Sequence, residues 1–311
     1  MRVPNSSFPG SLVTVLGRLS TRQDQLQTQV ATGQKLRLPE DNPTAMRRVM
    51  DLQAEGRQLQ QYQSNIDFAS NSATAAYSSI KGLKTIMDRA TELATRADGT
   101  RSPDDLKNMG TEVNQLLEQA LQVANTRQNG RYLMAGTRDD TVPFQAARDA
   151  NGRIASVSYS GNENVLSVQI GAGVEVSAQV IGANSSGGQP AGLFKDKTSG
   201  ADIFANLTAL RDALNQGDTS AIASTVRPAL VRDEDNVINQ LSNNGAMQAR
   251  LEAASAMVKA QGTAVDGLVS KDADADLAET MVKLSETQNA YRAALQSGST
   301  ILKESLMDYL R

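Results

Sequence analysis

Apolar residues recur every seven positions along much of this chain. Between Pro43 and Pro103 one apolar row falls seven residues apart, and a companion row lies three residues further on. The first row is Leu52, Leu59, Ile66, Ala73, Ile80, Met87 and Ala94, and the second is Tyr62, Ala69, Ala76, Leu83, Ala90 and Ala97. This period predicts a helix over roughly 44–97 that supercoils against its neighbours. At about 1.5 Å per residue it would be about 80 Å long, which is too long for a compact domain.

Four more segments carry helical patterns. A segment at 103–128 begins with Ser102 as a candidate N-cap and Pro103 in the first turn. A segment at about 220–270 keeps the seven-residue register through Leu230, Val237, Leu251, Val258 and Val265. The terminal segments, 11–32 and 277–308, alternate spacings of four and three. We therefore expect long helices at both ends of the chain.

The two terminal segments mirror each other. Their apolar positions are Leu12, Leu16, Leu19, Leu26 and Val30 at one end, and Leu277, Met281, Leu284, Tyr291, Leu295 and Leu302 at the other. Gln23 and Gln288 occupy equivalent positions in the two patterns, each where an apolar residue would be expected. Two such narrow stripes paired alone bury little apolar surface. These residues are therefore predicted to form an assembly interface between copies of the chain, and the alternative is an antiparallel coiled coil within a monomer.

The middle of the chain has a different character. Residues 131–181 hold alternating and β-branched stretches separated by Asn-Gly and Gly-rich turns, and a short helical pattern follows at 202–215. The predicted fold is mainly α, a long antiparallel helical bundle or coiled coil formed by the N- and C-terminal segments, with a small inserted β domain. We expect three parts: residues 1–43 with 271–311, residues 44–140 with 216–270, and residues 141–215.

The stretch "VATGQKLRLPEDNP" at 30–43 lies between two helical runs. One interpretation is a reactive site in which Glu40 and Asp41 act as an acid–base pair. The other is a joint, in which a glycine ends one helix and Asp41 or Asn42 caps the next. No recognisable partner accompanies the two carboxylates, so the joint is favoured. Its predicted residues are Gly33, Leu36, Leu38, Pro39 and Pro43, with the two leucines as packing contacts.

Composition narrows the possible functions. The chain has 311 residues, no cysteine and no histidine, which removes the commonest general base and thiolate metal sites. The "DADAD" stretch at 272–276 has the spacing of a calcium loop, but Leu277 and Lys283 stand where glycine and glutamate are needed. These acidic residues are better suited to capping the last helix. We therefore predict no catalytic, cofactor or metal site.

The charge pattern and the apolar runs bear on partners. The formal net charge is -3 and the basic residues are scattered, which disfavours nucleic acid as a partner. No apolar run reaches the roughly 18 residues of a membrane span. The N-terminus lacks the apolar region of an ordinary signal peptide. The chain is thus expected to be soluble, with copies of itself as its first partner.

Three stretches resemble the bacterial flagellin family. "LSTRQDQLQTQVATGQKLRLPEDNPTAMRRVMDLQ" (19–53) resembles the N-terminal signature of the family, and "DADLAETMVKLSETQNAYRAALQSGSTILKESLMDYL" (274–310) is similar to its C-terminal helix. "NGRYLMAGTRDDTVPF" (129–144) resembles the segment that leads into the outer domain of the family's junction subunits. The resemblance implies a secreted structural subunit at the junction between flagellar hook and filament. It also implies other flagellar axial proteins, an export chaperone and the secretion apparatus as partners.

Two alternatives remain open at this stage. A filament flagellin would share the terminal helices and would polymerise into long filaments by itself. A secreted coiled-coil adhesin or effector would use the helices as a stalk and the β domain as its ligand-binding tip. A stalk of this kind would not need matching apolar stripes in the two terminal helices, nor the distinctive joint at 30–43.

Overall fold

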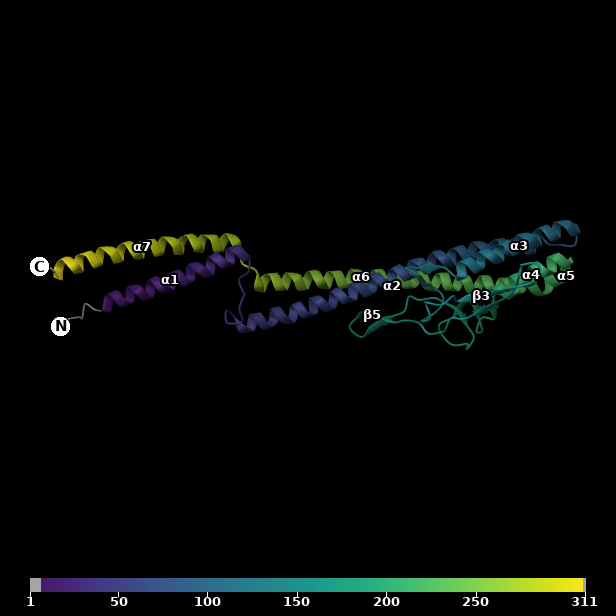
Figure 1. Ribbon diagram of the computed structural model, residues 1–311, viewed down its shortest axis with the longest axis horizontal. Helices are drawn as coiled ribbons and strands as arrows, with labels where there is room; N and C mark the ends of the chain where they lie inside the picture. Colours follow the sequence, from purple (N-terminus) through teal and green to yellow (C-terminus); the bar gives the residue numbers. More distant parts are fainter. Residues whose placement is uncertain (1–6, 310–311) are drawn as a thin grey trace. The chain divides into compact units, whose positions relative to one another are not determined.

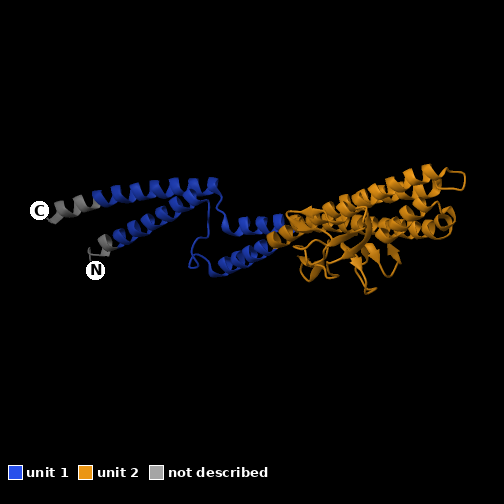
Figure 2. Cartoon of the chain, turned by 45° about the vertical axis from the view of Figure 1, so that its right-hand side comes forward, with its two compact units in different colours: residues 1–58, 261–311 blue, residues 59–260 orange. Residues whose placement is uncertain are grey.

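The computed structural model describes residues 7–309, with side chains over 11–300. Two compact units are present, residues 1–58 with 261–311 and residues 59–260 (Figure 2). Helices α2 (Pro43–Arg96) and α6 (Arg227–Ala273) contribute to both units. The mainly α fold with a small inserted β domain, expected from the sequence, is confirmed. The division into three parts stays a prediction.

The first unit holds the two terminal helices, α1 (Ser7–Thr32) and α7 (Leu277–Tyr309), which run side by side (Figure 1). Leu12 lies against Gly298 near one end of the pair, and Gln34 forms an antiparallel bridge with Asp274 beyond the other. These two contacts fix an antiparallel register. The helix bounds agree with the segments predicted at 11–32 and 277–308.

The second unit is built on helices α2, α3 (Pro103–Ala124) and α6. Ser102 caps α3, because its hydroxyl accepts a hydrogen bond from Asp105 N. The predicted heptad rows of α2 are buried from Leu59 onwards, and the predicted row of α6 is buried from Leu230 to Val265. The seven-residue period of the sequence therefore marks core positions of both long helices, and those from Leu59 in α2 and from Leu230 to Val258 in α6 belong to this unit.

The inserted β domain lies between α3 and α6 in the sequence. Three antiparallel hairpins are formed by β1 (Arg127–Gln128) with β2 (Arg131–Tyr132), β3 (Phe144–Arg148) with β4 (Ile154–Tyr159), and β5 (Val168–Gly171) with β6 (Val174–Val176). A three-stranded sheet has β7 (Ile181–Asn184) parallel to β8 (Gly192–Asp196), which pairs antiparallel with β9 (Ala201–Asp202). Helix α4 (Ile203–Gln216) follows, and short α5 (Thr219–Ala221) and a π-helical turn η1 (Ile222–Val226) lead into α6.

An aromatic cluster joins these strands to the helices. The rings of Phe194 and Phe204 stack with centroids 5.1 Å apart, and Phe144 packs at an angle against both. Arg148 on β3 forms a two-bonded ion pair with Glu118 on α3. The β domain is thus anchored on the helical core by both apolar and charged contacts.

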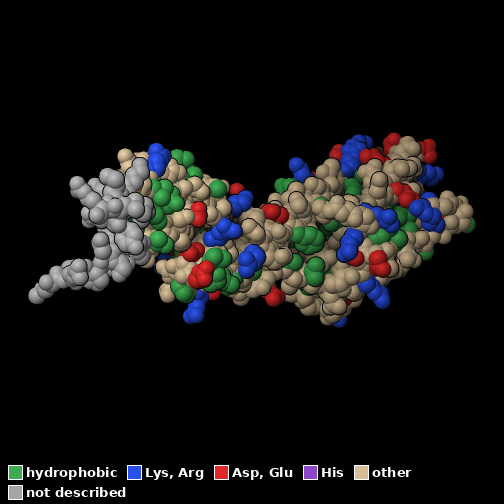
Figure 3. Space-filling model, turned by 60° about the vertical axis from the view of Figure 1, so that its left-hand side comes forward, with side chains coloured by type: hydrophobic (Ala, Val, Ile, Leu, Met, Phe, Trp, Pro, Cys, Tyr) green, Lys and Arg blue, Asp and Glu red, His purple; other side chains and the backbone are tan. Residues whose placement is uncertain are grey.

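Charged side chains of both signs are interspersed over the face of the molecule that Figure 3 displays. Figure 3 shows basic and acidic groups mixed on the face it displays, without a large area of one sign. None of the helices, over the residues described, combines the length and hydropathy of a membrane span.

Candidate assembly site

The predicted stripe of α1 is the face it turns toward α7. Its leucines at 12, 16 and 19 and Val30 are half-buried, and Leu26 is buried. From the two register contacts, Leu19 is expected opposite Tyr291 and Leu26 opposite Leu284. The apolar stripe of α1 is therefore partly covered by α7 of the same chain.

The stripe of α7 differs from the prediction. Most of the less exposed positions of α7 follow spacings of four and three through Thr280, Leu284, Thr287, Tyr291, Ala294 and Gly298, and Gln288 beside this row is also partly buried. Only Leu284 and Tyr291 of the predicted residues lie on this inner seam. The other four positions of the seam carry Thr, Ala or Gly, and the opposite positions of α1 mostly carry larger apolar side chains.

Three other predicted residues of α7 remain exposed. Leu277, Met281 and Leu295 are 45%, 55% and 46% exposed, and they define what we call the outer stripe. At 100° per residue they lie beside the inner seam, on the adjacent face of the helix. Leu302 falls outside the residues whose side chains are described. The α7 prediction therefore mixed two faces of one helix, an inner one used within the chain and an outer one left uncovered.

The joint is built from both connections of the first unit. Gly33 adopts φ +71°, and its N–H donates to Gln29 O, so it ends α1 as predicted. Its carbonyl accepts from Ala275 N at 2.8 Å, while Ala273 O accepts from the amides of Lys35 and Leu36. The segment after α1 is thereby paired with the turn between α6 and α7.

A small apolar cluster secures this pairing. Leu36, Val49 and Ala273 are buried together, with Ala45 and Val269 packed against them. Leu38 is 49% exposed, so within this chain only the first of the two predicted leucines is a packing contact. Pro39 and Pro43 are also exposed.

The acidic residues of the joint have structural roles. Asp41 accepts hydrogen bonds from the amides of Leu38 and Arg37, and these bonds hold the pKa of its carboxyl below the usual range. Asn42 is the cap of α2, since its side-chain oxygen accepts from Ala45 N at 3.1 Å. A carboxylate kept ionised by two amides serves to close a turn, which agrees with the joint interpretation.

The "DADAD" stretch has two separate roles. Asp272 binds Arg48 through two bonds of 2.5 and 2.7 Å, and Asp276 accepts from Glu279 N at the start of α7. Among the described residues no group of three potential metal ligands is found. The sequence indicated the capping role, but it gave no sign that Arg48, more than two hundred residues away, pairs with Asp272.

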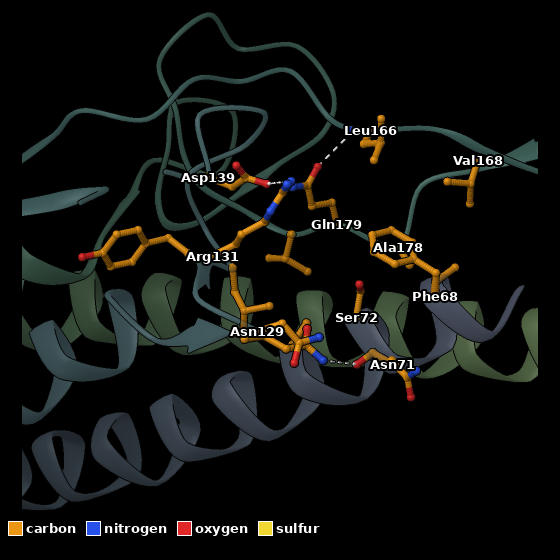
Figure 4. Close-up of a pocket in the computed structure, with 16 residues that line it drawn as sticks. Phe68, Asn71, Ser72, Asn129, Arg131, Asp139, Leu166, Val168, Ala178 and Gln179 are labelled. Carbon is orange, nitrogen blue, oxygen red and sulfur yellow. Dashed lines mark hydrogen bonds and ion pairs between the residues drawn. The ribbon is translucent and has the colours of Figure 1, made fainter. Parts of the chain in front are cut away.

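A cavity of about 360 Å³ lies in the second unit, between α2 and the β domain (Figure 4). Phe68, Leu166 and Val168 form part of its apolar wall. Its polar groups largely bind one another: Arg131 pairs with Asp139, and Gln179 is bonded to main-chain atoms at both ends of its amide. These bonds tie Arg131, Asp139 and Gln179 into the surrounding fold.

Comparison with known proteins agrees with the fold. Residues 12–139 match the family described as the bacterial flagellin N-terminal helical region. Flagellar hook-associated protein 3 of Escherichia coli is 26% identical over 235 residues, which are 72% of this chain and 70% of that protein. The protein of the same name from Salmonella typhimurium is 28% identical over 57% of this chain and 51% of that protein.

A solved structure shares the architecture. A flagellar hook-associated protein from Vibrio parahaemolyticus superposes with a TM-score of 0.64 at 18% identity, covering 75% of this chain and 100% of that one. At this identity the likeness shows the fold alone, and the sequence matches carry the relationship. The resemblance to the flagellin family is confirmed by them. The chain is therefore related to the bacterial flagellins and, among them, to flagellar hook-associated protein 3.

Proposed function

We propose that this chain is a structural subunit of the bacterial flagellum that forms the junction between hook and filament. The observation that carries the proposal is the outer stripe of α7, beside a helix pair that resembles the terminal helices of flagellins. Three large apolar side chains, each nearly half exposed or more, lie along one face of a long helix without cover from the described residues. Large apolar side chains left exposed along one face of a helix are candidates for contact with another molecule.

The proposal includes self-assembly through α1 and α7, which the exposed side chains of the outer stripe support. The outer stripe can pack against the helix pair of a neighbouring copy, as in a coiled coil with more than two helices. Val13 on α1, 69% exposed, offers further apolar surface. The partners are then other copies and adjoining axial proteins of the flagellum, with an export chaperone and the secretion apparatus required on the way. The role is structural rather than catalytic.

A deletion strain of the source bacterium tests the junction role. Cells without this gene should build hooks but shed unpolymerised flagellin into the medium. Attached filaments of normal length in that strain would contradict the proposal. A filament subunit is distinguished by seeding purified protein with filament fragments, because it elongates them whereas a junction subunit does not.

Complementation tests the outer stripe itself. Met281→Glu together with Leu295→Glu should abolish restoration of attached filaments, because two charges replace the apolar contact. Ala293→Glu is the matched control, since Ala293 is exposed on α7 away from both stripes. Circular dichroism of the purified variants should show unchanged helicity, and restored filaments in the double variant would rule out this surface.

A further inference from the structure

Asp233 on α6 is a fully buried carboxylate. Its side chain is 0% exposed, and each oxygen accepts one hydrogen bond. Asp202 N donates to Oδ1 at 2.9 Å, and the Asn206 side-chain amide donates to Oδ2 at 2.7 Å. Both donors are neutral, so no positive charge binds this carboxylate directly. A buried anion in such surroundings is costly to keep ionised.

Two neighbours of Asp233 hold the same part of the β domain. The amide of Asn236 donates to the carbonyls of Gly192 and Leu193, and the amide of Gln240 donates to Ala191 O. Asp233, Asn236 and Gln240 form one row along α6, which we call the α6 latch. The latch attaches the main chain around β8, β9 and the start of α4 to the long helix.

The charged groups around Asp233 do not neutralise it. On β9, the carboxylate of Asp202 is itself negative and pairs with Lys195 of β8 at 2.8 Å. On α4 the facing group is the neutral amide of Asn206, and on α6 the positive charge of Arg232 acts on Asp233 without a direct bond to it. Burial raises the pKa of Asp233 to about 6, and the charge of Asp202 adds to this against the lowering effects of Asn206, the Asp202 amide and Arg232.

We propose that the α6 latch is a proton-sensitive attachment. It tightens when Asp233 takes up one proton and loosens when Asp233 releases it. The protonated carboxyl still accepts from Asp202 N through one oxygen. Its new O–H donates to the Asn206 carbonyl oxygen once that amide turns over, so both bonds survive without the buried charge. Because the folded-state pKa is raised, the stabilisation is fully present below the unfolded pKa of about 4 and is lost as pH rises through about 6.

The composition of the chain allows the effect of Asp233 protonation on stability to be measured with little interference from other side chains. With no histidine and no cysteine, the sequence lacks the side chains that ordinarily titrate between pH 5 and 8. The carboxyls of Asp41, Glu92 and Glu118, whose pKa values are lowered, change charge below this window. A change in stability within the window that Asp233→Asn removes and Asp235→Asn leaves in place is therefore attributable to Asp233.

The experiment compares the full chain with Asp233→Asn and Asp235→Asn by urea unfolding at pH 5, 6, 7 and 8. Asparagine at 233 mimics the protonated acid, whereas Asp235 is an exposed acid of the same helix and serves as the charge-matched control. In the parent chain and in Asp235→Asn, the folding equilibrium constant should fall about tenfold from pH 5 to pH 8. In Asp233→Asn it should stay constant.

A second measurement is independent of whether the variants fold. In the parent chain, the NMR signals of the Asp202 amide and the Asn206 side-chain amide should titrate together with a midpoint near pH 6. Flat signals, or a parent stability that is constant across the window, would overturn the proposal. Equal effects of the two substitutions would also overturn it, because they would indicate general surface charge.

Discussion

Leu12 of α1 fills the space in front of Gly298 of α7: a β-carbon added to Gly298 would stand 2.5 Å from Leu12 Cδ2. The two helices approach each other closely at this point because the glycine has no side chain. Gly298 therefore completes the inner seam, which the small side chains of Thr280 and Ala294 also form.

Gly298→Leu should force the terminal helices apart. We expect a loss of about 1–3 kcal/mol from the α1–α7 pair, as for other insertions into packed sites. Limited proteolysis of the purified chain would detect it as faster cleavage within residues 7–32. Gly17→Leu is the matched control, since a β-carbon there meets nothing within 4 Å. Equal proteolysis of the two variants would show that the helices do not meet at Gly298.

Substitution of the two leucines of the joint should change the stability of the first unit to different extents. Leu36→Ser should destabilise the first unit by about 2–4 kcal/mol, because it puts a hydroxyl into the cluster with Val49 and Ala273. Leu38→Ser should change stability by less than about 0.5 kcal/mol, since Leu38 is half exposed. Thermal unfolding by circular dichroism measures both. If Leu38→Ser alone also stopped assembly, Leu38 would be a contact to another subunit.

The ion pair between Arg48 and Asp272 should contribute more than an ordinary surface pair. It is two-bonded, and the Asp272 side chain is only 16% exposed. We expect Asp272→Asn to cost about 0.5–1.5 kcal/mol and to loosen the joint, with the effect weakening at high salt. The exposed pair of Lys283 with Glu279 provides the comparison, and Glu279→Gln should cost less than about 0.5 kcal/mol. A salt-independent result for Asp272→Asn would contradict an electrostatic origin.

Acid should weaken the contact between the β domain and α3. The bonds from Arg148 lower the pKa of Glu118, so the stabilisation is present above the unfolded pKa and is lost as pH falls through the lower folded value. Stability of the second unit should therefore decline below about pH 4.5. Glu118→Gln should flatten part of this decline, and urea unfolding between pH 3 and 5 measures it. Because both side chains are partly exposed, we expect a small effect.

Many of the helices could be predicted from the sequence alone. The seven-residue rows of α2 and α6, the cap at Ser102 and the stop at Gly33 are local signals, and each is decided by neighbours within one or two turns. The mirrored terminal stripes were predicted to form an interface between copies, with an antiparallel pair inside one chain as the alternative, and the structure contains that pair. For α1 the predicted residues are those that face α7, because leucines at spacings of three, four and seven define one apolar face of the helix.

The tertiary structure decided which face of α7 is used within the chain. Thr280, Ala294 and Gly298 carry the seam because Leu12 and the other large residues of α1 supply the volume, and no local pattern marks such small residues as contacts. No local pattern in the sequence marks the pairing of Arg48 with Asp272 or the burial of Asp233 either. These relationships join residues far apart in the chain, so they arise only when folding brings the segments together. The sequence thus determined where the helices begin and end and which of their positions are apolar, whereas packing between distant segments determined which apolar stripe is covered and which is left exposed.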